Sequence, residues 1–267
     1  MKDKPFRTKK KFGQHLLTAP GVIQKIVDQL DITPEDIVVE IGVGTGQLTE
    51  EILGRNPEKL YGIEIDPEAY PVIEKRFSEH KNFQLIKKDF FDVNLFDLSE
   101  GKKIKIAGNL PYNVASLILV NMPFYLEIID LCVFMVQKEV ALKLIARPKT
   151  KQYTFLTVFL RTYFDIEYVM SVPARFFKPP PKVTSAVVKM FPRKNVPDFD
   201  KKGYKNFVSS LFSSRRKMLR SKIDPEILKK ANIPPEKRAE ELDILDFINL
   251  YQHLLSEKNG KNQNSRV

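Results

Sequence analysis

The sequence has few of the residues that build disulfide frameworks and metal centres. Its 267 residues include one cysteine, Cys132, three histidines and no tryptophan. A single thiol cannot close an intramolecular disulfide or form a cysteine-based metal site. The sequence therefore predicts no metal centre, and its cysteine content fits the reducing cytoplasm.

The chain also lacks a long hydrophobic run. The most apolar long window, 117–136, is interrupted by Asn121, Pro123, Glu127 and Asp130, so it predicts no membrane span. The basic N-terminus has no apolar segment of the kind found in secretory signals. Hydrophobic residues make up 43% of the chain, which is enough for one large domain with a smaller companion.

The net charge of +11 is concentrated at the two ends of the chain. Residues 1–12 carry six basic side chains against one acidic side chain, and residues 194–267 carry sixteen against ten. The stretch between them is neutral. Basic ends around a neutral body favour binding to a polyanion such as RNA, although lysine-rich ends that only maintain solubility would look the same.

Apolar runs alternate with helical periods through about residue 190. This alternation predicts an α/β fold with a doubly wound, mostly parallel sheet. The expected strands are 37–41, 59–65, 83–87, 104–107 and 131–136, followed by a hairpin of 166–172 and 184–190. The expected helices in this part begin near Pro20 and cover 47–53, 67–80 and 117–119, with mixed or helical structure over 138–161.

The pattern changes after residue 193. A linker to residue 200 precedes helical spacing over 204–212, and a later helix is expected over 244–255. These patterns predict four parts: a basic arm (1–12), a catalytic domain (13–193), a small all-α RNA-binding domain (194–256) and a disordered tail (257–267).

A glycine turn and two acidic residues follow the first three predicted strands. The turn contains Gly42, Gly44 and Gly46, and Glu64 and Asp89 end the next two strands. Carboxyl ends of parallel strands share one sheet edge, where Glu64 would accept both ribose hydroxyls of an adenosine and Asp89 its amino group. Either acid alone is more simply a solvated carboxylate, but three successive strand ends favour a ligand site. Dinucleotide binders have the spacing G-x-G-x-x-G, but this chain has Gln at position 47, where their third glycine would stand. The spacing G-x-G-x-G therefore favours S-adenosylmethionine over NAD.

The fourth strand leads into Asn109-Leu110-Pro111-Tyr112. An adenine amino group is a poor nucleophile, so an enzyme that methylates it must hold its N–H groups on acceptors that also stabilise positive charge. The Asn109 side-chain oxygen and the Leu110 carbonyl, which Pro111 biases toward an extended backbone, supply two such acceptors. Tyr112 supplies a flat face for the base. Without other support, the same four residues also fit an ordinary proline turn.

Together, several segments resemble a known family, the KsgA-type adenine N6-dimethyltransferases of small-subunit ribosomal RNA. The matching segments are K-F-G-Q-H-L-L (11–17), V-E-I-G-V-G-T-G-Q-L-T (39–49), E-I-D (64–66), D-F (89–90), N-L-P-Y-N (109–113), F-K-P-P-P-K-V-T-S-A-V-V (177–188) and R-R-K-M-L-R (215–220). The resemblance covers about residues 8 to 255. It implies a Rossmann-like class I S-adenosylmethionine methyltransferase fold.

The resemblance also implies residue roles. It places His15, Leu17, Gly42, Glu64, Asp89 and Asn109 at the S-adenosylmethionine site, from which S-adenosylhomocysteine would leave as product. It places Asn109, Leu110 and Tyr112, with Phe177, around the target adenine. Many members have Asn where this chain has His15, and His can still donate a hydrogen bond.

The expected substrate is ribosomal RNA in an immature small subunit, where family membership implies dimethylation of two adjacent adenosines near the 3′ end. Phosphate contacts are expected from Arg215, Arg216, Lys217 and Arg220, unless these form a solvated helix face. Nothing in the sequence demands more than a monomer. Two alternatives remain: a large-subunit rRNA methyltransferase conferring macrolide resistance, and a non-catalytic rRNA-binding assembly factor. DNA adenine methyltransferases and NAD enzymes fit less well.

Overall fold

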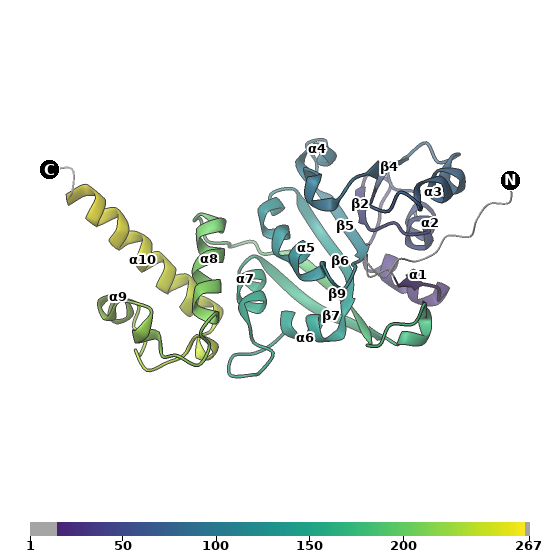
Figure 1. Ribbon diagram of the computed structural model, residues 1–267. Coiled ribbons are helices and arrows are strands. Elements are labelled where there is room, and N and C mark those ends of the chain that lie inside the picture. The colour runs from purple at the N-terminus through teal and green to yellow at the C-terminus, as the bar shows by residue number, and fades with distance from the viewer. Residues whose placement is uncertain (1–14, 265–267) are drawn as a thin grey trace. The chain divides into compact units, whose positions relative to one another are not determined.

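The computed structural model describes residues 15–264, which form two compact units (Figure 1). We call residues 15–141 and 165–192 the sheet unit, and residues 142–164 and 193–264 the helical unit. The basic arm predicted over 1–12 lies outside the described residues. Within residues 15–264, no helix is both long and apolar enough to cross a bilayer.

The sheet unit is built on a seven-stranded sheet with the order β4-β3-β2-β5-β6-β9-β7. Every expected strand is confirmed. The strands, in sheet order, are β4 (Phe83–Lys87), β3 (Lys59–Glu64), β2 (Ile37–Ile41), β5 (Ile104–Asn109), β6 (Ile129–Gln137), β9 (Ser185–Pro192) and β7 (Phe164–Val172). The first five strands in this order, β4, β3, β2, β5 and β6, pair in parallel, whereas β9 pairs antiparallel with β6. The strand order reverses between β2 and β5, which is where such sheets bind ligands.

Three helices cover one face of the sheet: α1 (Pro20–Asp28), α2 (Gln47–Leu53) and α3 (Tyr70–Phe77). Their apolar side chains pack on alternate strand residues, including Val38, Leu60 and Val133. Helix α1 begins at Pro20, whose missing N–H costs nothing in a first turn. Helix α4 (Leu95–Ser99) follows β4, and helix α5 (Ala115–Asn121) follows β5.

A second, two-stranded sheet was not predicted from the sequence. Strand β1 (Leu16–Leu17) pairs antiparallel with β8 (Phe177–Lys178). Two-residue strands are too short to show a period of alternating polarity, so only the tertiary structure reveals them. The register places Leu17 opposite Phe177, and both side chains enter the main core.

The helical unit contains α7 (Phe155–Tyr163), α8 (Lys201–Phe212), α9 (Pro225–Lys230) and α10 (Ile244–Asn264), preceded by α6 (Lys138–Leu144), which begins in the sheet unit. Helix α7 packs against α8 and α10, and the Thr162 and Tyr204 hydroxyls are 3.1 Å apart. Residues 142–164 therefore belong to this unit, whereas the sequence placed them in the catalytic domain. Helix α10 also continues to Asn264, although disorder was predicted from residue 257. A helix that is already nucleated can propagate into polar sequence.

Candidate active site

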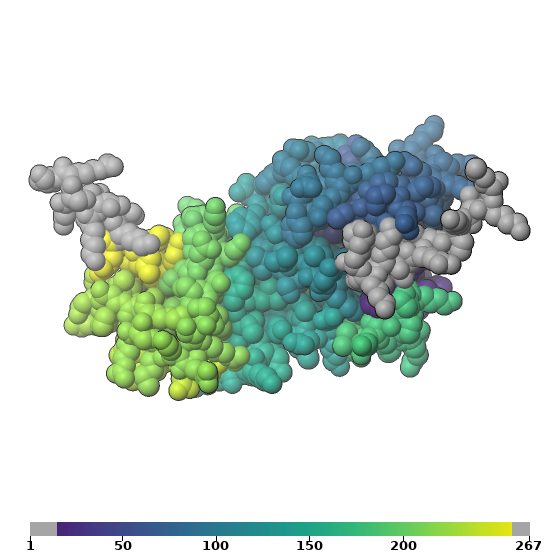
Figure 2. All heavy atoms as spheres, viewed as in Figure 1, coloured from purple at the N-terminus to yellow at the C-terminus, as the bar shows by residue number. Residues whose placement is uncertain are grey.

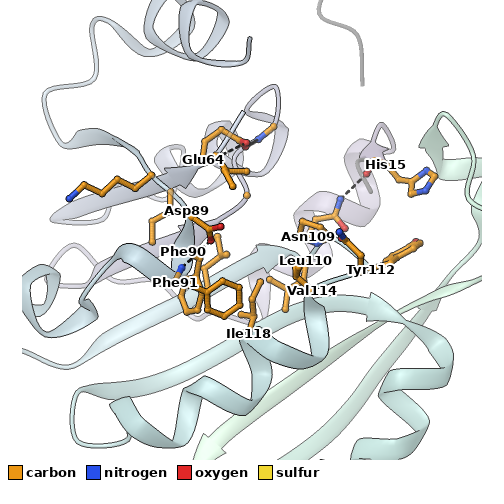
Figure 3. A pocket seen from close by; sticks show the side chains of 18 of the residues that line it. His15, Glu64, Asp89, Phe90, Phe91, Asn109, Leu110, Tyr112, Val114 and Ile118 are labelled. Atoms are coloured by element: carbon orange, nitrogen blue, oxygen red, sulfur yellow. Dashed lines mark hydrogen bonds between the residues drawn. The ribbon is translucent and has the colours of Figure 1, made fainter. Parts of the chain in front are cut away.

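An open cavity lies beyond the carboxyl ends of β2, β3, β4 and β5 (Figure 3). It brings together side chains from segments that are far apart in the sequence. The predicted residues along its lining are His15, Gly42, Gly44, Glu64, Asp89, Asn109, Leu110 and Tyr112. The structure thus gathers eight of the predicted cofactor and substrate residues at one sheet edge.

The glycine turn has the backbone that only glycine adopts readily. Gly42, Gly44 and Gly46 have φ values of +80°, +59° and +85°. Gly42 and Gly44 line the cavity, but Gly46 does not. A Cβ atom on Gly46 would lie 2.5 Å from the ring of Phe77, so Gly46 allows α3 to pack closely. Gly46 thus has a packing role, and its contact with the cofactor stays a prediction.

Glu64 is buried at the end of β3 and is held by backbone amides. Its Oε2 accepts a hydrogen bond from the Gly44 N–H at 2.7 Å, and its Oε1 accepts from the N–H groups of Ile65 and Asp66 at 3.0 and 2.8 Å. Burial raises the pKa of Glu64, and these amides oppose that rise. A carboxylate has about four lone-pair sites. Three are used here and one remains for a ligand, while acceptance of both ribose hydroxyls stays a prediction.

Asp89 follows β4 and faces the same cavity. Its Oδ1 accepts a hydrogen bond from the Phe91 N–H at 3.1 Å, which fixes the turn after the strand. Phe90 and Phe91 pack edge to face, with ring centroids 5.4 Å apart, and both line the cavity. In the sequence Phe90 was singled out only as part of the D-F segment of the resemblance, and Phe91, which is 45% exposed, was missed.

Asn109 ends β5, and its side chain is oriented by the N-terminal segment. Its Nδ2 donates a hydrogen bond to the backbone carbonyl of His15 at 2.9 Å. Because a carbonyl can only accept, this contact identifies the amide nitrogen and places Oδ1 on the other side of the group. Leu110 is held as well, since its N–H donates to the Met135 carbonyl at 3.0 Å.

Tyr112 lies beside these acceptors. Its hydroxyl is hydrogen-bonded with the buried Ser185 hydroxyl at 2.5 Å. Burial raises the pKa of the phenol, so Tyr112 stays neutral. Its ring centroid is 5.3 Å from that of His15, with 30° between the planes. The Asn109 amide, the Leu110 backbone and the Tyr112 ring are therefore held together at the wall of the cavity.

Two predicted site residues lie in the core instead. Phe177 is 2% exposed and packs in the cluster that contains Leu17, so its ring is not available to stack on a base. The prediction that Phe177 holds the target adenine is corrected, because pairing of β8 with β1 turns this side chain inward. Leu17 does not line the main cavity but does line a smaller one next to Gly42, Gly44 and Asn109.

The smaller cavity contains a residue that sequence reasoning missed. Glu40 lies on β2, is 1% exposed, and accepts a hydrogen bond from the Thr49 hydroxyl at 2.6 Å. Burial raises its pKa to about 8. A charged residue inside the otherwise β-branched run 37–41 was the signal that could have identified it. Acidic side chains thus line both cavities, and the raised pKa keeps Glu40 protonated at neutral pH. Among the described residues, no cluster suited to a metal ion is present.

The four predicted RNA contacts separate into two kinds. The guanidinium of Arg215 donates a hydrogen bond to the Glu240 carboxylate. It also donates to the backbone carbonyls of Thr150 at 2.7 Å and Lys151 at 2.9 Å. Arg215 therefore connects two segments of the helical unit, and its role as a phosphate contact is corrected. The remaining three are exposed: Arg216, Lys217 and Arg220.

Comparison with known proteins agrees with this geometry. A family model described as ribosomal RNA adenine dimethylase matches residues 5–255. A ribosomal RNA small subunit methyltransferase A from Persephonella marina is 67% identical over 264 residues, covering 97% of this chain and 99% of that protein. 

Two solved structures are similar. A dimethyladenosine transferase from Plasmodium falciparum has a TM-score of 0.79 at 26% identity, over 93% of this chain and 98% of that one. The 23S rRNA methyltransferase ErmE has a TM-score of 0.66 at 25% identity, over 90% and 99%. The fold is the class I methyltransferase fold, and the chain belongs to the ribosomal RNA adenine dimethylase family.

Proposed function

We propose that this protein transfers methyl groups from S-adenosylmethionine to N6 of adenosines in small-subunit ribosomal RNA. The observation that carries the proposal is the orientation of Asn109, whose amide nitrogen is occupied by the His15 carbonyl. Its oxygen is thereby assigned as an acceptor beside Leu110 and Tyr112. An adenine amino group needs such acceptors, and the names of the relatives support this substrate.

The residues of the two adjoining cavities fit S-adenosylmethionine, which when bound supplies an electrophilic methyl group. Glu64 would accept a ribose hydroxyl, and Asp89 with Phe90 would contact the adenine of the donor. Gly42 and Gly44 would let the backbone approach the donor closely. Glu40, which is protonated at neutral pH, would face the amino-acid end of the donor in the smaller cavity.

The target adenosine must leave its stack, at a cost of about a few kcal/mol. Stacking on Tyr112 would return roughly 1–3 kcal/mol of that cost. Asn109 Oδ1 and the Leu110 carbonyl would then accept hydrogen bonds from N6 and stabilise the positive charge that develops on it. N6 would form a new bond to the methyl group that the donor supplies, the electron pair of the broken C–S bond would stay on sulfur, and N6 would give its proton to water. Most of the acceleration would come from positioning.

We further propose that two adjacent adenosines near the 3′ end are each dimethylated, in an immature subunit, by a monomer in the cytoplasm. The exposed Arg216, Lys217 and Arg220 would contact RNA phosphates. The high identity to a small-subunit methyltransferase favours this over the large-subunit alternative. The intact acceptor geometry favours an enzyme over a non-catalytic assembly factor.

One assay tests the proposal. The protein is incubated with labelled S-adenosylmethionine and, separately, unmethylated small subunits, large subunits, naked ribosomal RNA and DNA, and the modified nucleosides are mapped. We expect N6-dimethyladenosine in small-subunit RNA. Label mainly in large subunits or DNA, or in none of the substrates, would contradict the proposal.

A further inference from the structure

His15 makes three contacts that join separate parts of the site. Its backbone carbonyl accepts the hydrogen bond from Asn109 Nδ2 at 2.9 Å. Its ring lies 5.3 Å from the ring of Tyr112. Its Nδ1 donates a hydrogen bond to the Pro179 carbonyl at 2.8 Å. One residue therefore touches the amide and the aromatic ring proposed to hold the target base, and also the proline-rich loop 179–181.

The segment around His15 is fixed to that loop by further bonds. Leu16 and Leu17 pair with β8, and both the N–H and the hydroxyl of Thr18 donate to the Phe176 carbonyl, at 2.8 and 3.1 Å. The loop is part of the green segment at the surface of the sheet unit in Figure 2. At the His15 end, the hydrogen bond between Nδ1 and Pro179 continues this pairing. Its loss would free the carbonyl that orients Asn109.

We propose that His15 is a positioning residue for methyl transfer, beyond any contact that it makes with the cofactor. Through its carbonyl it fixes which way the Asn109 amide points, and through its ring it limits the tilt of Tyr112. The hydrogen bond to Pro179 holds residue 15 where both contacts are possible. This inference rests on the proposed function, because Asn109 and Tyr112 are the groups that it positions.

The chemistry of the side chain allows the two contacts to be separated. Asn carries its Nδ2 on Cγ, the same atom that carries Nδ1 in His, so His15→Asn can keep the hydrogen bond to Pro179 and lose only the ring. His15→Phe keeps a ring beside Tyr112 and loses the hydrogen bond. His15→Ala loses both.

The test compares these three variants of the full chain, with unmethylated small subunits and labelled S-adenosylmethionine. At saturating donor we expect His15→Ala to lower kcat about tenfold to hundredfold, the effect of misplacing a reacting group. We expect His15→Asn to stay within about threefold of the parent chain and to be more active than His15→Phe. In His15→Ala the Kd for S-adenosylmethionine, measured by calorimetry, should change by a smaller factor than kcat, and donor binding by each variant also shows that it is folded. The exposed His80, changed to Ala, serves as the control.

Two outcomes would overturn the inference. One is a His15→Ala variant with the parent kcat at saturating donor, whatever its Kd, since that limits His15 to cofactor binding. The other is a His15→Asn variant as impaired as His15→Ala, since that removes the hydrogen bond from the argument. Asn109→Ala is measured in parallel: if that variant is active, the proposed function itself fails, independently of the results at position 15.

Discussion

Gly46 offers a direct test of how the glycine turn works, because the ring of Phe77 occupies the space that a Cβ at this position would need. We expect Gly46→Ala to destabilise the sheet unit and to leave donor affinity nearly unchanged. An alanine at φ +85° costs about 1–2 kcal/mol in backbone energy. Its Cβ would also lie 2.5 and 2.7 Å from two atoms of the Phe77 ring. Overpacking of this kind typically costs a further 1–3 kcal/mol, so the total is about 2–5 kcal/mol.

A matched control separates the two contributions. Gly101 has nearly the same backbone, with φ +79°, but a Cβ there would meet no atom within 4 Å. Gly101→Ala should therefore cost only the backbone energy, about 1–2 kcal/mol. Urea unfolding measures both free energies, and calorimetry measures the Kd for S-adenosylmethionine. Two results would refute the packing role. One is a Gly46→Ala variant that is no less stable than Gly101→Ala, and the other is a Gly46→Ala variant that loses donor affinity while keeping the stability of the parent.

Three further predictions concern charge. Native Glu40 keeps its proton up to about pH 8, whereas an unfolded glutamate ionises near 4.5, so the native state binds more protons and its stability falls as pH rises between these values. In Glu40→Gln the amide oxygen can still accept the hydrogen bond from Thr49, but the side chain no longer titrates. As pH rises over that range, its free energy of unfolding should therefore increase relative to that of the parent by at most about 1.4 kcal/mol per pH unit. Parallel curves of unfolding free energy against pH would contradict this. Arg215→Ala should destabilise the helical unit by about 1–2 kcal/mol in thermal unfolding, whereas Arg216→Ala should not; equal effects would show that the contacts of Arg215 contribute nothing. Reversing Arg216, Lys217 and Arg220 to Glu should flatten the dependence of log K for RNA on log salt by about 2 to 3, without changing donor affinity, and an unchanged slope would exclude these phosphate contacts.

Much of the sheet edge could be predicted from sequence because its signals are local. β-branched runs identify buried parallel strands, and the residues just after them must meet at one edge. Gly42, Glu64, Asp89 and Asn109 follow directly from that rule, and the cavity contains all four. The family resemblance added His15, which also lines the cavity.

The errors arose where long-range pairing decides the direction of a side chain. Phe177 lies in a motif that resembles a base-binding segment, yet its pairing with Leu17 buries the ring. Arg215 shares a basic run with Arg216, but its carboxylate partner, Glu240, comes from 25 residues later in the chain. Sequence spacing cannot show either partner, because neither contact follows a helical or strand period.

The central claim is that the Asn109 side chain accepts a hydrogen bond from the adenine amino group during methyl transfer. The most direct measurement is single-turnover methylation of unmethylated small subunits by Asn109→Ala at saturating donor, together with the Kd for S-adenosylmethionine. Loss of one preorganised hydrogen-bonding group at a reacting centre costs about 10²–10³ in rate. We therefore expect a loss of at least about hundredfold in the methylation rate, with donor binding reduced only modestly. A variant that binds the donor and methylates at the parent rate would contradict the account.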